Sequence, residues 1–287
     1  MSDATTVPVC YRHPNRTTYL SCSECNRPIC PDCSHDAPVG QKCPECVRAA
    51  GRQRVVNARS ITGAPSFQTS PVVFSLIAIN VAIFVIGLSS ASLESDLIIN
   101  FGALTRGIVG GELIGFDAGE WWRAVTAAFL HGSIMHILFN MYFLYIFGPR
   151  LERQVGSVAF SGIYLASAAG GSMATYLFGP VSTFSVGASG ALFGLFGAWL
   201  YAAYRQRGSA AGSAMFNQLG AILLINMALP LFIPNIDWRA HLGGLVTGIA
   251  VAFLWEQIAA GRSNARQMRA IVAFGVLVAL LAALAVL

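Results

Sequence analysis

From residue 71 to its end, the chain is a series of apolar runs separated by short polar segments. A helix needs about 20 mostly apolar residues to cross the hydrocarbon core of a bilayer. Only 11% of the residues are charged, against about 25% in soluble domains. The pattern predicts an all-α polytopic membrane protein with seven spans, near residues 71–88, 133–149, 157–178, 188–204, 215–233, 240–257 and 270–287.

The basic residues predict the orientation of these spans. Of the 18 lysines and arginines, all but Arg106, Arg123 and Arg239 lie before the first span or after the second, fourth or sixth. Those four segments share one side of the membrane, and an excess of basic residues marks the cytoplasmic side. We therefore expect a multi-pass protein of the cell (inner) membrane, with a cytoplasmic N-terminus and an extracytoplasmic C-terminus. The polar, cysteine-rich start argues against a cleaved signal peptide.

All seven cysteines fall within residues 1–46, the first predicted domain. Together with one histidine they form four pairs, and two residues separate the members of each pair. This spacing lets both side chains of a pair reach one tetrahedral zinc ion, and an odd number of cysteines in a reducing compartment disfavours disulfides. The predicted ligands of two structural zinc ions are Cys10, His13, Cys22, Cys25, Cys30, Cys33, Cys43 and Cys46.

Only four residues separate Cys25 from Cys30, so two adjacent pairs could share an ion only through a very tight loop. An interleaved arrangement is favoured, in which the first pair joins the third and the second joins the fourth. His35 is a ninth candidate ligand. The pattern resembles the B-box and related cross-brace zinc fingers, and the alternative is a disordered, redox-active tail.

The charge of this head, four basic against five acidic residues, disfavours nucleic acid as its partner and favours a protein contact or a regulatory role. Residues 47–70 form the next predicted domain, a flexible linker with four arginines. Basic residues close to a membrane are attracted to the anionic cytoplasmic leaflet. We therefore expect the linker to lie near that surface.

Polar side chains at the start of the second span are candidates for function, because ionisable groups inside spans usually face the bundle interior. His136 and Asn140 are four residues apart and share one helix face, and His131 precedes the span. On spacing alone, hydrogen bonding between helices accounts for them about as well.

The fourth and sixth spans each carry small residues at about every fourth position. Such faces let two helix backbones approach closely. A close pairing of these spans predicts that the serine at the start of one lies near the histidine at the start of the other. The residues concerned are Ser189, Gly190, Gly194 and Gly197 in the fourth span, and Ala240, His241, Gly244 and Gly248 in the sixth.

That pairing suggests nucleophilic catalysis. A serine hydroxyl is a weak nucleophile until a base removes its proton, and His241 could take the proton of Ser189 and return it to a leaving amine. The backbone N–H of Ser189, the Asn140 amide and His136 are the candidate donors for an oxyanion.

A third catalytic residue would have to be Asp237, four residues before His241. An aspartate there more often caps the helix start, so a Ser–His dyad is favoured over a triad. The residues around Ser189 also lack the second glycine of the G-x-S-x-G elbow, and no buried strand precedes them. This excludes a soluble α/β-hydrolase.

Taken together, these motifs resemble the rhomboid family of intramembrane serine proteases. The resemblance covers residues 71–257 and implies a six-helix protease core with Ser189 as nucleophile and His241 as base, without a cofactor for catalysis. It also implies an oxyanion hole of His136, Asn140 and the Ser189 amide. The residues that carry it are Trp122–Arg123, His131, His136, Asn140, Glu152, Gly187–Gly190, Ala240–His241 and Gly244.

Other parts of the chain complete this interpretation. Glu152 and Arg123 would be structural, and residues 258–287 add a linker and a seventh transmembrane helix outside the core. Many bacterial members of the family have a tyrosine four residues after the serine, stacked on the histidine. Here Phe193 keeps the ring and lacks the hydroxyl, so we expect the stacking on the histidine to be retained.

The resemblance implies a serine endopeptidase that cleaves transmembrane segments of protein substrates within the lipid bilayer, near their extracytoplasmic end and often beside a small residue. A catalytically inactive rhomboid-like protein that binds client transmembrane helices is the main alternative. A transporter or scaffold whose zinc head is the working part is the third. The presence of Ser189, His241 and Asn140 favours the first, and the scarcity of ionisable residues in the later spans disfavours a transporter.

Overall fold

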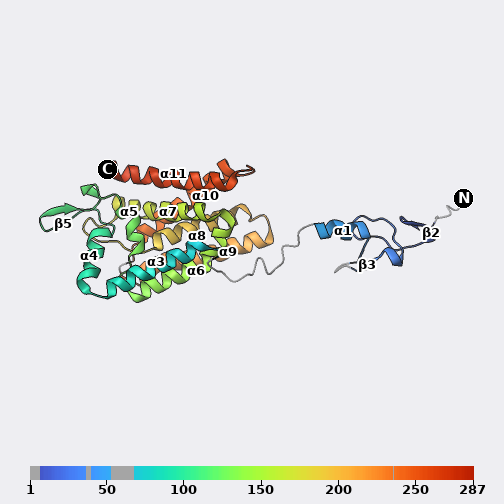
Figure 1. The fold of residues 1–287 in the computed structure, drawn as a ribbon, viewed down its shortest axis with the longest axis horizontal. Helices are drawn as coiled ribbons and strands as arrows, with labels where there is room; N and C mark the ends of the chain where they lie inside the picture. The colour runs from blue at the N-terminus through green and yellow to red at the C-terminus, as the bar shows by residue number, and fades with distance from the viewer. Residues whose placement is uncertain (1–6, 37–39, 53–67, 235) are drawn as a thin grey trace. The chain divides into compact units, whose positions relative to one another are not determined.

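The computed structural model describes residues 7–36, 40–52, 68–234 and 236–287. The chain divides into two compact units, Met1–Ala64 and Pro65–Leu287. The ribbon in Figure 1 shows short strands and one helix in the first unit and a bundle of helices in the second. Each unit is described by itself.

The first unit is a small module whose interior consists of six buried cysteines and Ile29. So short a segment cannot bury enough apolar surface to be stable without disulfides, metals or a partner. Its helix, Pro44–Arg52, extends over the first residues of the predicted linker. Residues 53–67 of that linker lie outside the described residues. The elements are β1 (Val9–Cys10), β2 (His13–Thr17), η1 (Pro31–Cys33), β3 (His35–Asp36), β4 (Gln41–Lys42) and α1 (Pro44–Arg52), with β1 antiparallel to β2 and β3 antiparallel to β4.

The second unit is helical apart from one hairpin, which projects from one end of the bundle in Figure 1. Its elements are α3 (Pro71–Leu88), α4 (Ala91–Phe101), β5 (Gly107–Val109), β6 (Glu112–Ile114), η2 (Phe116–Ala118), α5 (Arg123–Thr126), η3 (Ala127–Phe129), α6 (Ile134–Val155), α7 (Ser157–Phe178), α8 (Ser189–Arg205), α9 (Ala210–Ala228), η4 (Leu229–Leu231), α10 (Trp238–Ala259) and α11 (Ala265–Val286).

Each of the seven predicted spans coincides with a long helix, α3 or one of α6 to α11. Helix α9 begins five residues before the predicted span because the Ser209 hydroxyl accepts a hydrogen bond from the N–H of Gly212 at 3.1 Å. It ends at Ala228 and continues as the 3-10 turn η4, because Pro230 has no N–H to donate to the carbonyl oxygen four residues before it. Helix α6 runs past Pro149 to Val155.

By length and composition, four helices of the described chain can cross a membrane: α3, α9 with η4, α10 and α11. A fifth candidate is the pair Arg123–Phe129 and Ile134–Val155, which is bent by 97°. Helix α8 has only 17 residues, and α7 is rich in Gly, Ala and Ser. The chain is thus a multi-pass helical protein, and crossing by α7 and α8 stays a prediction.

Helices α7, α8 and α10 pack closely against one another and form the centre of the bundle. Helix α11 packs along α7 and α10 at the outside (Figure 1), where the Trp255 indole N–H donates to the carbonyl oxygen of Arg269 at 2.8 Å. Helix α3 packs against α6. The central position of α7 accounts for its small residues, because they allow three neighbours to approach.

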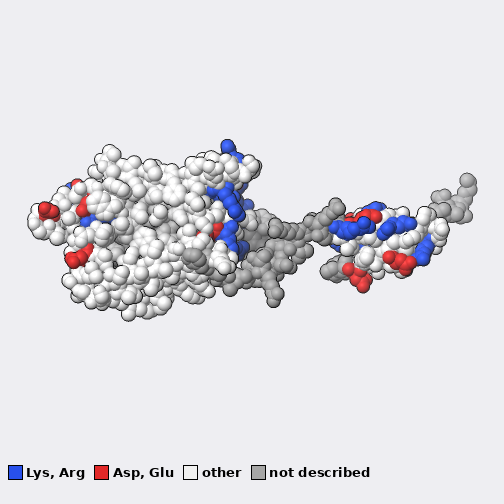
Figure 2. Space-filling view, in the orientation of Figure 1, with Lys and Arg blue, Asp and Glu red and all other residues white. Residues whose placement is uncertain are grey.

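Charged side chains of the second unit gather at its two ends, with an uncharged band between them (Figure 2). Large exposed apolar residues such as Leu138, Phe139 and Leu224 lie on helices of this band. Soluble monomers rarely expose contiguous apolar surface on this scale. The end where α6 and α8 finish and α11 begins carries Arg150, Arg153, Arg205, Arg207, Arg262, Arg266 and Arg269, and the other end carries Glu94, Asp96, Glu112, Asp117 and Glu120 among others.

Candidate functional site

Helices α8 and α10 touch through their backbones. A Cβ atom added at Gly244 of α10 would overlap the carbonyl oxygen of Gly190 in α8, and one at Gly248 would overlap the carbonyl oxygen of Gly194. No side chain fits at either contact. The prediction that stripes of small residues bring these two helices together is confirmed.

This contact lies in the N-terminal halves of the two helices. Ser189 is the first residue of α8, and His241 lies in the first turn of α10. Phe193, one turn after Ser189, stacks on the imidazole of His241 with ring centroids 4.2 Å apart and planes inclined by 11°. The stacking predicted from the retained ring is confirmed. In the part of the chain that the structure describes, the Ser189 hydroxyl makes no hydrogen bond to the imidazole.

Two histidines flank the chain just before Ser189. Gly187 has a φ of +129°, and a Cβ atom there would lie 2.6 Å from Nε2 of His136. Nε2 of His131 accepts a hydrogen bond from the N–H of Ala188 at 3.5 Å, and the two histidine rings are 5.0 Å apart. Only glycine suits position 187, because a side chain would require strained backbone and would displace His136.

Asn140 lies one turn after His136 on the same face of α6 and is 6% exposed. Its Nδ2 donates to the carbonyl oxygen of His136 at 2.8 Å. A carboxamide nitrogen carries two hydrogens, so the second is available to another acceptor. For Asn140, the hydrogen bonding between helices that the spacing left open is not seen among the described residues, since this bond is internal to α6.

Asp237 caps α10, as the sequence favoured. Its Oδ1 accepts hydrogen bonds from the N–H groups of Arg239 at 3.1 Å and Ala240 at 3.3 Å. Nδ1 of His241 is buried and has no hydrogen-bond partner among the described residues. Asp237 therefore does not orient the imidazole as the acid of a triad would.

Two buried charged residues of the resemblance have structural contacts. Glu152 is 1% exposed and accepts hydrogen bonds from the N–H groups of Val72 and Val73 at the start of α3, both at 3.0 Å. Arg123 is also 1% exposed; it forms an ion pair with Glu120 at 2.6 Å and donates to the carbonyl oxygen of a glycine in the loop after α4. These contacts fasten α3 and the loop before α6 to the bundle.

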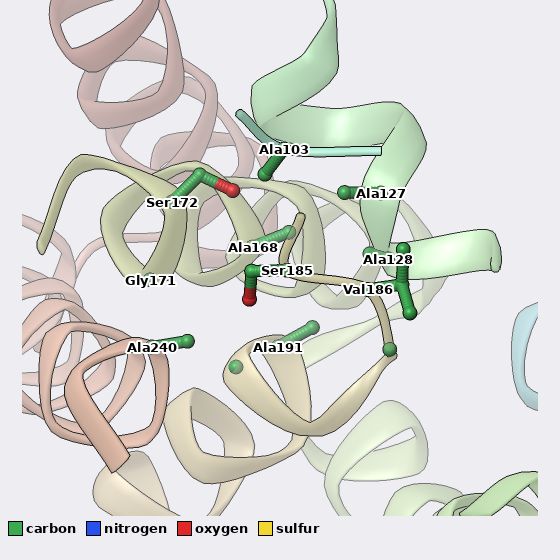
Figure 3. A pocket seen from close by; sticks show the side chains of 12 residues that line it. Ala103, Ala127, Ala128, Ala168, Gly171, Ser172, Ser185, Val186, Ala191 and Ala240 are labelled. Carbon is green, nitrogen blue, oxygen red and sulfur yellow. The ribbon is translucent and has the colours of Figure 1, made fainter. Parts of the chain in front are cut away.

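A cavity of about 20 Å³ lies behind the start of α8. Figure 3 shows it between α7, α10 and the loop that leads into α8, with Ser185 close to Ala191 and Ala240. A volume of this size holds about one water molecule. Apart from Val186, it is lined by Ala, Gly and Ser, among them Ala127, Gly171 and Gly190.

The first unit has two groups of four side chains, each able to hold a metal ion. Within each group, the ligand atoms lie within 4.8 Å of one another. The pairs interleave as the sequence predicted. All seven cysteines are free thiols. His35 lies on β3 and belongs to neither group. The groups are Cys10, His13, Cys30 and Cys33, and Cys22, Cys25, Cys43 and Cys46.

The spacing of these atoms fits a tetrahedral ion. Zinc–sulfur bonds of about 2.3 Å place the sulfurs of a tetrahedral site about 3.8 Å apart, and Sγ of Cys25 lies 3.8 Å from Sγ of Cys43. In the other group Nδ1 of His13 lies 3.4 Å from Sγ of Cys30 and of Cys33. The residues present therefore fit two metal ions.

Arg27 supplies positive charge to the group of four cysteines. Its Nε donates to Sγ of Cys25 at 3.3 Å, and this bond holds the pKa of the Cys25 thiol below its usual value. The guanidinium also forms an ion pair with Glu45 at 2.8 Å and lies 4.6 Å from the ring centre of Tyr11. The sequence reasoning missed this role, because no spacing rule links an arginine to a thiolate.

The Rhomboid domain family matches residues 118–257, from η2 to α10. The chain is 36% identical over 154 residues to the putative rhomboid protease YdcA of Bacillus subtilis strain 168, and the match covers 54% of this chain and 77% of that protein. The chain belongs to the rhomboid family. As a rhomboid, it has α3, α4 and α11 outside the matched residues, and its cysteine-rich module precedes them.

Two further rhomboid relatives match less of their own length. Rhomboid protease GluP of Bacillus subtilis strain 168 is 33% identical over 213 residues, which cover 73% of this chain and 40% of that protein. RHOMBOID-like protein 6, mitochondrial, of Arabidopsis thaliana is 42% identical over 144 residues, covering 48% of this chain and 45% of that protein. The chain therefore spans less than half the length of each.

Proposed function

We propose that this rhomboid is an active intramembrane serine endopeptidase, with Ser189 as nucleophile and His241 as general base. The stacking of Phe193 on His241 is the observation that carries the proposal. Phe193 is one helical turn from Ser189, so the imidazole rests against the first turn of the helix that Ser189 begins. A base must lie this close to activate a serine hydroxyl.

The chemistry follows from these groups. Oγ of Ser189 attacks the carbonyl carbon of a substrate peptide bond while His241 takes the hydroxyl proton. The carbon–nitrogen bond then breaks, His241 gives the proton to the leaving amine, and an acyl-enzyme ester remains. Water, deprotonated by His241, attacks the ester and releases the acid and the free serine.

The oxyanion formed in each step needs donors. The N–H of Ser189 is one, because the first N–H groups of a helix have no partner within it. The second hydrogen of the Asn140 amide and the imidazole of His136 are the others we propose. Support for His136 comes from its contact with Gly187, two residues before Ser189.

No acid is required in this proposal. The Asp237 carboxylate caps α10, and Nδ1 of His241 lacks a partner among the described residues. Stacking on Phe193 holds the ring instead, which supports a dyad. The alternative is a catalytically inactive rhomboid-like protein that binds client transmembrane helices.

We propose transmembrane segments of membrane proteins as substrates, cut near their extracytoplasmic end. The small residues around the cavity behind α8 support cleavage beside a small side chain. The arginines at the end of the bundle where α6 and α8 finish support a cytoplasmic location for that end and for the N-terminus, with the C-terminus outside.

For the head we propose two structural zinc ions, one in each interleaved group. Thiolate and imidazole ligands at tetrahedral spacing favour zinc, and the scarcity of other core residues explains why a metal would be needed. Its partner would be a protein rather than nucleic acid.

The deciding experiment labels the purified full chain in detergent with a serine-directed fluorophosphonate. We expect labelling of the wild type, none of Ser189→Ala, and strongly slowed labelling of His241→Ala. A wild-type protein that stays unlabelled while it binds a transmembrane segment in liposomes would favour the inactive alternative.

A further inference from the structure

The carboxylate of Asp237 connects three segments of the chain beside the proposed catalytic pair. While Oδ1 caps α10, Oδ2 accepts hydrogen bonds from the hydroxyl of Thr175 at 2.6 Å and from that of Ser185 at 2.8 Å. Thr175 belongs to the last turn of α7, and Ser185 to the loop between α7 and α8. Both oxygens of the carboxylate are thus in use.

Ser185 is held from its other side as well. Its backbone N–H donates to the carbonyl oxygen of Ala103 at 2.8 Å, and its carbonyl oxygen accepts from the N–H of Ala103 at 3.0 Å. Two residues later, the N–H of Gly187 donates to the carbonyl oxygen of Ala127 at 2.9 Å. The loop that ends at Ser189 is therefore held on one side by the backbone of Ala103 and Ala127 and on the other by the Asp237 carboxylate.

We propose that Asp237 is a positioning residue that sets the loop carrying Ser189 in register with the helix carrying His241; the inference rests on the function proposed above. The same side chain fixes the first turn of α10 through Oδ1 and the loop through Oδ2, so one carboxylate relates the nucleophile to the base. Hydrogen bonds to an ionised carboxylate are stronger than neutral ones. Small displacements of reacting groups slow catalysis steeply.

The two halves of this role can be separated. Asp237→Ser keeps a side-chain oxygen suited to capping α10, because serine is as good a cap as aspartate. It removes the oxygen that binds Thr175 and Ser185. Ser185→Ala removes one donor and leaves the carboxylate in place.

The chain offers a matched control at the other end of the bundle. The hydroxyl of Ser157 donates to Glu152 at 2.7 Å, and that carboxylate also caps a helix, α3. Ser157→Ala therefore removes the same kind of bond as Ser185→Ala, far from Ser189. Both variants should lower the thermal stability by similar amounts.

The test measures the fluorophosphonate labelling rate of Ser189 in the detergent-purified full chain. We expect labelling at least about tenfold slower in Asp237→Ser, because the variant loses two charge-assisted hydrogen bonds and one alone represents about that factor. Ser185→Ala should be slowed by a smaller factor. The double variant should be no slower than Asp237→Ser, because both changes break the same hydrogen bond between Ser185 and Asp237. Ser157→Ala should label at the wild-type rate. Wild-type rates in both Asp237→Ser and Ser185→Ala would overturn the proposal.

Amide hydrogen exchange gives a readout that does not depend on activity. Asp237→Ser should increase the exchange of the Ser185 and Gly187 amides, and Ser157→Ala should not. Unchanged exchange at both amides would contradict the positioning role even in a protein that never labels. An unlabelled wild type would instead reject the proposed function and leave the exchange result to decide about Asp237.

Discussion

The ring of Phe193 lies flat on the imidazole of His241, with centroids 4.2 Å apart and an angle of 11° between the planes. The stack is made by residues of two different helices, so it fixes the imidazole relative to the first turn of α8. It does so without a polar partner for Nδ1 among the described residues. In the proposed mechanism, ring stacking takes the place that a carboxylate has in a catalytic triad.

Removing that ring should slow the labelling of Ser189. An aromatic pair contributes about 0.5–1.5 kcal/mol beyond its buried area, so Phe193→Ala should label with fluorophosphonate several-fold to about tenfold more slowly. Phe193→Tyr keeps the stack and should label at close to the wild-type rate. Equal rates for Phe193→Ala and the wild type, at equal folded fraction, would show that the stack does not position His241.

The contact between α8 and α10 should be intolerant of any added methyl group. Gly248→Ala places a methyl group on the carbonyl oxygen of Gly194, and overpacking of this kind costs about 1–3 kcal/mol. We expect a clear loss of thermal stability in detergent and slower labelling. Gly220→Ala is the control, since nothing lies within 4 Å of a Cβ there; it should be as stable as the wild type or more so. A fully stable Gly248→Ala would refute the backbone contact.

The buried guanidinium of Arg123 should depend on its carboxylate partner. Glu120→Gln leaves a charge that is 1% exposed without its counter-ion, and we expect about 3 kcal/mol of destabilisation from a buried pair broken in this way. Thermal unfolding in detergent measures it. Glu112→Gln, on the exposed strand β6, is the control and should unfold at the wild-type temperature. Coincident unfolding of the two variants would argue against a role for the pair.

Metal analysis of the purified chain should find close to two zinc ions per molecule. Cys25→Ser should lower the content to about one, because the two groups share no ligand. A metal-free head that remains folded would contradict the assignment.

Arg27→Gln should speed release of zinc from the group of four cysteines to a chelator. Loss of a residue that hydrogen-bonds a metal ligand typically weakens binding about 10- to 100-fold. The matched control is Arg48→Gln, whose side chain bonds a carbonyl oxygen rather than a thiol. Equal release rates in the two variants would show that Arg27 does not support the site.

The helices and their central contact could be predicted from the sequence because both have local signatures. Apolar length indicates each span, and glycine at every fourth position indicates where backbones meet, as at Gly244 and Gly248. The pairing of the cysteines followed from a steric argument, since four residues between Cys25 and Cys30 are too few to fold two pairs onto one ion.

The contacts of Asp237 could be predicted only in part. Capping follows from its place before a helix, within the same few residues. Its bonds to Thr175 and Ser185 join positions 62 and 52 residues away, and serine and threonine are too common for such a pairing to leave a sequence signal. The hydrogen bond from Arg123 to the carbonyl oxygen of Gly102, 21 residues away, was missed for the same reason. The exact ends of α9 depended on a serine cap and a proline that hydropathy does not register.

Helices that meet at bare backbone have no side chains between them to rearrange. α8 and α10 therefore move as one rigid unit, which keeps residues 189 and 241 in a fixed relation. In the proposed function, a substrate would therefore have to reach these two residues where the packing is looser. Helix α9, whose buried residues are Gly212 and Leu219 alone among those described, is packed more loosely than α8 or α10.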